Sequence, residues 1–197
     1  GHDYFEGFEE VLDVLAQNEV HASFFLTGDF IRNHQSLTQK IDQQGHFVGA
    51  HSDKHLLYSD WNHRDSLLHS EAEIKQDILD NLNELDALNI FPDYFMPPYE
   101  WYNKQVIKIA GELGQITVNF SPGTRSNADY TTPDMPNYLD SETILKSIYD
   151  REDQSGLQGF HLLIHPGTSP LRKDKLYHHL DDLIQELKNR GYSFRRF

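Results

Sequence analysis

The feature that most limits the possible folds of this chain is a regular alternation of short apolar runs with longer amphipathic stretches. Apolar runs of strand length indicate buried strands, and apolar residues spaced three and four apart indicate helices. The runs that suit strands are residues 20–27, 46–50, 93–96, 115–120, 160–164 and 192–197. The stretches that suit helices are residues 6–18, 29–43, 70–89, 106–113, 141–151 and 176–187. Alternation of this kind predicts an α/β fold with a parallel sheet.

Length and composition predict one domain, covering residues 1–197. The chain has 197 residues, of which 38% are hydrophobic, and this is enough to bury a substantial core. Nothing in the sequence is apolar for long enough to cross a bilayer, so we expect no membrane span. The chain opens abruptly on Gly1, and we expect a fragment from which a first strand and any export signal are missing.

Charge and cysteine content exclude some classes of function. The formal charge is −14, from 17 basic and 31 acidic residues, and this argues against a general nucleic-acid binder, which needs a basic face. The chain has no cysteine, so disulfides and thiolate metal sites are impossible. A transition metal would have to be held by His, Asp or Glu, and this ligand set favours zinc or a similar divalent ion.

Histidines and one acid lie just after predicted strands or at the start of the chain. His51 and His55 follow the run 46–50, His165 follows the run 160–164, and Asp3 lies at the start. Active sites of α/β folds gather at the carboxyl ends of strands, and two neutral imidazoles with one carboxylate are a common zinc site. His51 and His55 would share a face if residues 51–55 form a helical turn. The alternative is two unrelated surface histidines.

His165 is a candidate general acid, because the ordinary pKa of histidine lies near neutrality. The alternative is a structural histidine held by the loop that Pro166 begins. Tyr99, after Pro97 and Pro98, could present a backbone amide to a developing oxyanion, although an ordinary strand-ending turn fits the pattern better.

Residues 56–69 show no clean period and are expected to form a loop. Within it, Tyr58 and Trp61 could line a sugar-sized cleft. Packing of both aromatic rings onto the domain is an equally good interpretation of the pattern.

Four stretches resemble motifs of the polysaccharide deacetylase family, also known as the NodB homology domain or carbohydrate esterase family 4. Residues 22–28 are similar to its A-T-F-F-x-x-G strand, and residues 49–55 contain its H-[ST]-x-x-H motif. Residues 95–99 are similar to F-R-P-P-Y, and residues 162–165 to its apolar run ending in histidine. The resemblance implies a distorted (β/α)7 barrel.

The resemblance also implies an activity: metal-dependent hydrolysis of acetyl groups, chiefly N-acetyl, from an oligo- or polysaccharide, with release of acetate. It implies that Asp3, His51 and His55 hold one divalent metal ion, with zinc as the first choice. The backbone amide of Tyr99 would hold the oxyanion, and His165 would protonate the departing amine. A cell-envelope or secreted location is implied as well.

Two departures from the family pattern indicate a divergent subgroup. His2 stands where the family has its catalytic aspartate base, and Met96 stands where it has an arginine that orients the base. We take His2 as the candidate base and Arg125 as the candidate replacement for the arginine. Pro97, Trp61 and Arg125 complete the expected substrate-binding set with Tyr99.

Asp129 is the candidate for the acid that the family pairs with its last histidine, here His165. The departures leave a second hypothesis open, in which the chain is a metal-containing carbohydrate-binding domain that has lost its catalytic base. A third hypothesis is a metallohydrolase that acts on another acyl bond, such as a peptide amide.

Overall fold

The computed structural model describes residues 4–197, and their contacts divide the chain into two compact units. We name residues 22–119 with Arg196 and Phe197 the sheet unit. We name the described residues up to His21 with residues 120–195 the helical unit. The expectation of a single domain over residues 1–197 stays a prediction.

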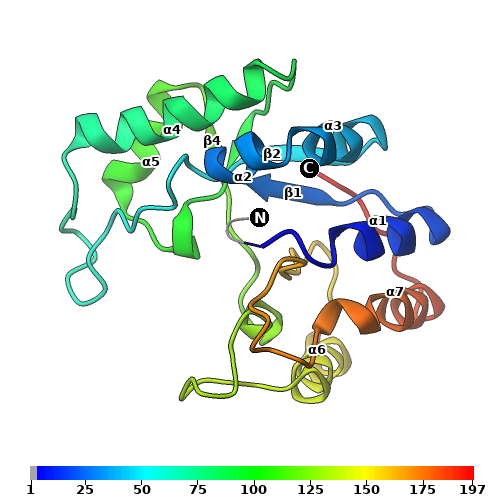
Figure 1. The fold of residues 1–197 in the computed structure, drawn as a ribbon. Coiled ribbons are helices and arrows are strands. Elements are labelled where there is room, and N and C mark those ends of the chain that lie inside the picture. The colour runs from blue at the N-terminus through cyan, green and yellow to red at the C-terminus, as the bar shows by residue number, and fades with distance from the viewer. Residues whose placement is uncertain (1–3) are drawn as a thin grey trace. The chain divides into compact units, whose positions relative to one another are not determined.

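The sheet unit contains a four-stranded parallel sheet whose spatial order is the chain order (Figure 1). Its strands are β1 (Ser23–Leu26), β2 (Phe47–Ala50), β3 (Tyr94–Phe95) and β4 (Ile116–Thr117). Leu26 pairs with Ala50, and Ala50 in turn pairs with Phe95. Because the strands are parallel, their carboxyl ends share one edge of the sheet. The predicted α/β fold with a parallel sheet is confirmed.

The helices of the sheet unit are α2 (Gly28–Asn33), α3 (Gln35–Gln43), α4 (Glu71–Asp86) and α5 (Lys104–Glu112), with a short 3₁₀ turn, η1 (Pro98–Glu100). The helix predicted over 29–43 is divided at His34, whose φ of −137° and ψ of 45° are not helical. His34 donates its N–H to Phe30 and accepts from Thr38, so it ends α2 and begins α3. Helix α4 begins with a capping box, in which the side chain of Ser70 accepts from the N–H of Glu73 and the side chain of Glu73 accepts from the N–H of Ser70.

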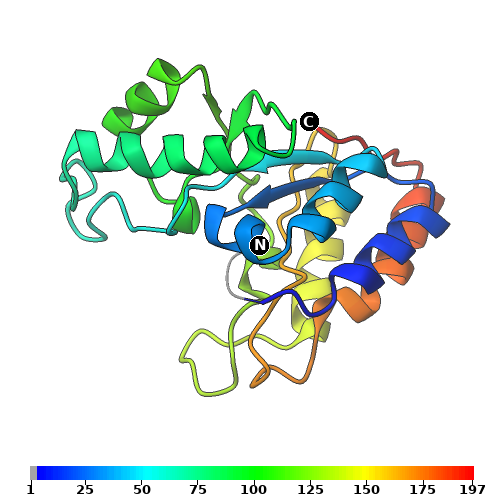
Figure 2. The same ribbon diagram turned by 45° about the horizontal axis from the view of Figure 1, so that its top comes forward.

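The helical unit consists of α1 (Phe8–Gln17), α6 (Ser141–Ser155) and α7 (Leu180–Asn189), with 3₁₀ turns η2 (Ser126–Ala128) and η3 (Leu176–His179). Helix α6 contributes Ile144 and Ile148 to an apolar core that also contains Leu183 and Leu187 of α7. Helix α1 packs on α7, as Figure 2 shows. This core fixes the scaffold on which the long loops of the unit are carried.

The strands predicted over residues 160–164 and 192–197 are wrong, because the structure assigns neither segment to a strand. The apolar pattern did correctly predict side chains that turn toward the core, since Leu162, Ile164 and Phe194 pack against the core of the helical unit. A strand also needs a neighbour with which to build a ladder of backbone hydrogen bonds. Apolar periodicity carries no information about that neighbour.

A loop occupies residues 56–69, as predicted, and a second loop occupies residues 121–139, apart from η2. Within residues 4–197, every helix is too short or too polar to pass through a bilayer.

Candidate functional site

His51 and His55 lie close together at the carboxyl end of β2, with ring centroids 4.9 Å apart. The helical turn over residues 51–55 that would place both histidines on one face is not formed. Ser52 and His55 instead have positive φ angles of 68° and 55°, and the His55 N–H donates to Ser52 Oγ over 3.0 Å. Two left-handed residues turn the chain tightly enough to bring the rings together without a helix. The expected proximity of the two imidazoles is therefore confirmed, with a different backbone.

The hydrogen bond of the His51 ring determines where its proton lies. His51 Nδ1 is 2.7 Å from the backbone carbonyl oxygen of Met96. A carbonyl can only accept, so Nδ1 carries the hydrogen and the lone pair of the neutral ring lies on Nε2. This is the form in which a histidine binds a divalent metal ion while its other nitrogen is held by the protein. The donor set of the His51–His55 pair thus fits a metal ion.

Asn81 of α4 holds the backbone at the start of this loop. Its side chain is fully buried; Oδ1 accepts the N–H of His51 over 2.8 Å, and Nδ2 donates to the carbonyl of Leu26 over 3.1 Å. One amide therefore joins the ends of β1 and β2 to α4. It satisfies two backbone groups that lie beyond the last ladder bonds.

Asp77, one turn earlier on α4, holds the second half of the loop. Its carboxylate accepts from the N–H of Lys54 over 2.9 Å and from the hydroxyl of Tyr58 over 2.6 Å. Burial raises the pKa of Asp77, and burial together with the Asp77 charge raises the pKa of Tyr58 well above its ordinary value. Tyr58 is fully buried, so the packing interpretation is correct for this ring.

Sequence reasoning missed Asp77 and Asn81, although a signal for them was present. Both lie on the face of α4 that also buries Ile74, Ile78 and Leu85. Polar residues four apart on an otherwise apolar helical face must find buried partners. Such a pair points to a hydrogen-bonded structure beneath the helix.

Gly28 allows the loop to approach the start of α2. A Cβ atom on Gly28 would lie 1.8 Å from Asp53 Oδ1, so no larger residue fits unless the carboxylate moves. Asp53 is buried and pairs with Arg32, whose Nη1 lies 2.7 Å from Oδ1. The glycine of the strand motif is therefore required by the loop that carries the histidines.

Tyr99 lies beside His55, with ring centroids 4.5 Å apart. The backbone of Tyr99 is left-handed, at φ 58° and ψ 10°, and Glu100 follows at φ 52°. Left-handed non-glycine residues are uncommon and concentrate at functional sites. Pro97 is buried and its carbonyl accepts from the N–H of Glu100, which fixes this turn. Within residues 4–197, no backbone acceptor engages the Tyr99 N–H.

Trp61 is 54% exposed, and its ring lies 5.8 Å from that of Tyr99 and 5.5 Å from that of Trp101. The cleft interpretation is therefore compatible with Trp61, whereas Tyr58 is a packing residue. Sequence reasoning did not single out Trp101.

In the helical unit, His165 is held by Asp129 through two hydrogen bonds. Asp129 Oδ1 lies 2.6 Å from His165 Nδ1, and Oδ2 accepts the backbone N–H of His165 over 2.6 Å. The carboxylate is only 2% exposed, so water does not compete for the hydrogen bonds by which it orients the ring. The predicted contact between Asp129 and His165 is confirmed.

Two buried cations hold the loops on either side of this pair. Arg172 is fully buried, and its Nη1 donates to the carbonyls of Thr131 and Leu139 over 2.8 and 2.9 Å. Lys175 Nζ donates to the carbonyls of Thr168 and Ser169 over 3.0 and 2.9 Å. Loop carbonyls that lack a ladder are thereby satisfied by long cationic side chains.

The remaining predicted site residues are not tested by these contacts. Asp3 and His2 lie outside the described residues. Within the described part of the chain, no group of three His, Asp or Glu side chains is arranged to hold a metal ion. Arg125 is exposed and donates its backbone N–H to Ser147 Oγ, and its role as a replacement for the missing arginine stays a prediction.

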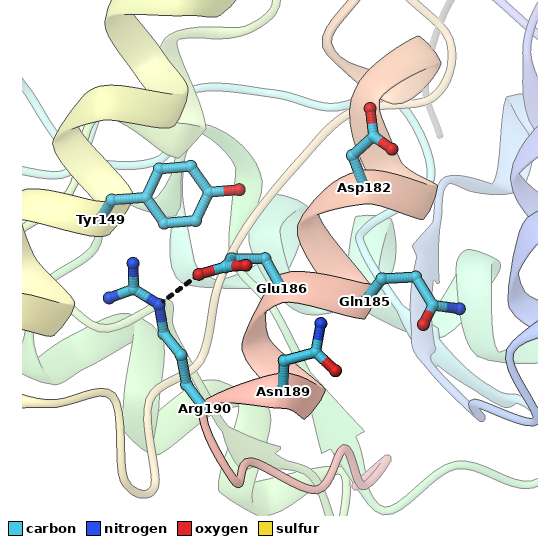
Figure 3. A pocket seen from close by; sticks show the side chains of 6 residues that line it. All are labelled: Tyr149, Asp182, Gln185, Glu186, Asn189 and Arg190. Carbon is cyan, nitrogen blue, oxygen red and sulfur yellow. Dashed lines mark hydrogen bonds and ion pairs between the residues drawn. The ribbon is translucent and has the colours of Figure 1, made fainter.

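A cavity of about 420 Å³ opens between α6 and α7 in the helical unit (Figure 3). It is lined by Tyr149, Asp182, Gln185, Glu186, Asn189 and Arg190. Two of the lining residues form an ion pair, in which Arg190 Nε lies 2.7 Å from Glu186 Oε1. None of the predicted site residues lines this cavity, so it is separate from the candidate site.

Comparison with known proteins identifies the family. The family model described as polysaccharide deacetylase matches residues 3–118. The chain is 31% identical over 195 residues to the uncharacterized protein YlxY of Bacillus subtilis, a match that covers 98% of this chain and 51% of that protein. It is 27% identical to a peptidoglycan-N-acetylglucosamine deacetylase of Bacillus cereus, covering 94% of this chain and 77% of that protein. The chain thus spans about half the length of YlxY.

A solved structure confirms the type of fold. The structure of a CE4 family pseudoenzyme from Bacillus anthracis matches with a TM-score of 0.74 at 22% identity, covering 97% of this chain and 60% of that one. At this level of identity the likeness concerns the fold, and the predicted polysaccharide deacetylase type of α/β fold is confirmed. The chain belongs to the polysaccharide deacetylase family.

Proposed function

We propose that this chain is a metal-dependent deacetylase that hydrolyses N-acetyl groups of a saccharide and releases acetate. The observation that carries the proposal is the pair His51 and His55, with the His51 lone pair placed on Nε2 by the carbonyl of Met96. A site prepared in this way suits a divalent cation. The name of the Bacillus cereus relative supports a glycan of the cell envelope as substrate, and with it a cell-envelope or secreted location.

The metal ion would be held by His51 and His55 together with Asp3, and zinc suits this ligand set. When bound, it would polarise the acetamide carbonyl and lower the pKa of water. His2 is the candidate base for that water. The oxyanion donor and the general acid are proposed among residues whose contacts the structure describes.

The backbone N–H of Tyr99 is proposed as the oxyanion donor. The left-handed turn after Pro97 fixes its direction, and a donor fixed in advance stabilises developing charge without reorganisation. His165 is proposed as the general acid for the departing amine, with its Nδ1 held by Asp129 and with Nε2 as the atom that would carry the proton to be given up.

A second candidate function is favoured by Met96. The side chain at this position is apolar and buried, so it supplies no charge to orient a base, and only its backbone contributes to the site. With His2 in the place of the usual base, the chain would bind a metal ion and a saccharide without turnover. The description of the Bacillus anthracis structure as a pseudoenzyme shows that this fold occurs without catalysis.

Single substitutions of the histidines test the metal assignment. We expect His51→Ala and His55→Ala each to lose bound metal, measured by elemental analysis after gel filtration, and to lose acetate release from N-acetylglucosamine oligomers. The matched control is His63→Ala, which removes an exposed histidine of the same unit. Full metal content in both site variants would refute the assignment. If the two variants lose metal but the wild-type protein itself releases no acetate, the result would support the binding function instead.

A further inference from the structure

An aromatic surface continues outward from the histidine pair in the sheet unit. From His55 the ring of Tyr99 follows at 4.5 Å, Trp61 at a further 5.8 Å, and Trp101 at a further 5.5 Å. Tyr99 and Trp61 are exposed at 45% and 54%. We call Tyr99, Trp61 and Trp101 the aromatic platform. Exposed aromatic rings in contact with a candidate site mark a ligand surface, because they offer large rigid contact areas at low entropic cost.

Arg64 lies against Trp101, the member of the platform farthest along from His55. Its guanidinium lies 4.2 Å from the ring centroid of Trp101 and 5.6 Å from that of Tyr102, and its Nε donates to the carbonyl of Tyr102 over 2.7 Å. Stacking and one hydrogen bond thus fix the plane of the group. A guanidinium has five N–H donors, so the terminal nitrogens retain donors for a ligand.

The surroundings of Arg64 make it unusual in this chain. Acidic residues outnumber basic ones by 31 to 17, and Arg32 and Arg190 each pair with several carboxylates. Within residues 4–197, no carboxylate lies at ion-pair distance from Arg64. A cation that is oriented, exposed and not neutralised by its own chain is suited to bind an anion supplied by a ligand.

We infer that the platform and Arg64 form a binding surface for an acetylated saccharide chain that carries carboxylate groups. The apolar faces of sugar rings would lie on the exposed rings of Tyr99 and Trp61, and a carboxylate on a ring beyond the reacting one would pair with Arg64. This inference rests on the proposed function for the location of the reacting sugar. It adds a preference for anionic over neutral chains and names Arg64 as the residue that sets it.

The two tryptophans of the chain, Trp61 and Trp101, both belong to the platform, so tryptophan fluorescence reports on this surface. The experiment measures dissociation constants by fluorescence titration with two tetrasaccharides. One is the neutral N-acetylglucosamine tetramer, and the other alternates N-acetylglucosamine with N-acetylmuramic acid bearing a free lactyl carboxylate. Titration after chelation of metal prevents turnover during the measurement.

We expect wild type to bind the anionic tetramer about three- to fivefold more tightly, as suits one exposed ion pair, with the preference lost at high salt. Arg64→Gln should abolish the preference and leave binding of the neutral tetramer unchanged. Arg64→Lys should restore part of it, because the charge remains but the planar fork is lost. Lys108→Gln, an equal charge change at an exposed position of α5, is the matched control.

Equal binding of the two tetramers by wild type would overturn the inference, as would a preference that survives in Arg64→Gln. Loss of both affinities in Arg64→Gln would assign Arg64 a purely structural role and overturn it as well. Acetate release is measured separately on the metal-loaded protein. A retained preference without acetate release would refute the deacetylase proposal while leaving the binding surface intact.

Discussion

In the sheet unit, His51 follows a hydrogen-bonded parallel strand, whereas His165 in the helical unit follows a segment that the structure assigns to no strand. The two units hold these histidines by different means. Around His51 the backbone is tied by short buried acceptors, the amide of Asn81 and the carboxylate of Asp77. Near His165 the loops are tied by long buried donors, Arg172 and Lys175.

The difference follows from which backbone groups each unit leaves without partners. A parallel ladder satisfies most groups of the strands, so only a few N–H groups beyond the strand ends need side-chain acceptors. Loops without a ladder expose many carbonyls, and a guanidinium or ammonium can satisfy several at once. Both histidines are fixed through Nδ1, by the carbonyl of Met96 and by Asp129 respectively. A neutral carbonyl at Nδ1 suits His51 as a metal ligand. A carboxylate at Nδ1 suits His165 as a general acid, because that ring has to carry a positive charge.

Asp129→Asn is expected to give the largest effect. The amide can present a donor rather than an acceptor to Nδ1, so the ring loses its orientation and the support for its charged form. We expect kcat for acetate release to fall about 10²- to 10⁴-fold, the usual range for removing acid–base catalysis. Metal content should stay at the wild-type level. Asp134→Asn, at an exposed position in the same loop, is the control.

Activity within a few-fold of wild type in Asp129→Asn would show that the Asp129–His165 pair is structural. Loss of metal would show that the roles of the two units are not separate.

Arg172→Met should destabilise the helical unit. The substitution keeps an apolar stem but leaves the buried carbonyl of Thr131 and the partly buried carbonyl of Leu139 without their donor, at a cost of about 3 kcal/mol in the free energy of unfolding. Urea denaturation measures this cost, and Lys173→Met at the exposed neighbouring position is the control. We expect the folded variant to retain metal. An unchanged unfolding midpoint would contradict the role given to Arg172.

Asn81→Ala should give a smaller loss, about 2 kcal/mol, because it leaves the N–H of His51 and the carbonyl of Leu26 without partners. It should also weaken metal affinity, roughly tenfold, since the backbone of His51 is released. Metal titration of the apoprotein measures the second effect. The control is Asn83→Ala on the exposed face of α4. Equal metal affinity in Asn81→Ala and Asn83→Ala would mean that the loop is held without Asn81.

Much of the sheet unit could be predicted because its signals are local. The apolar runs predicted β1 to β4 to within a few residues, and the spacing of apolar residues predicted that α4 begins near residue 70. Proximity of His51 and His55 also followed from their spacing, although the left-handed turn at Ser52 did not. Positive φ at a non-glycine residue is imposed by surrounding contacts and leaves no mark in the sequence.

The parts that sequence could not supply depend on contacts between distant segments. The carbonyl of Met96 that orients His51 is contributed by backbone, which residue identity does not report. Asp129 could be proposed as the partner of His165 only from the family resemblance, because 36 residues separate the two and no local pattern links them. The run 160–164 lacks a strand because pairing requires a neighbour, and only the fold decides which segment that is.

The most direct test of the central claim is metal content of the purified wild-type protein, with acetate release from N-acetylglucosamine oligomers measured before chelation, after chelation and after zinc is restored. The account predicts one divalent ion per chain, acetate release that the chelator abolishes, and recovery on addition of zinc. A protein that carries no metal, or that releases acetate equally well after complete chelation, would contradict it.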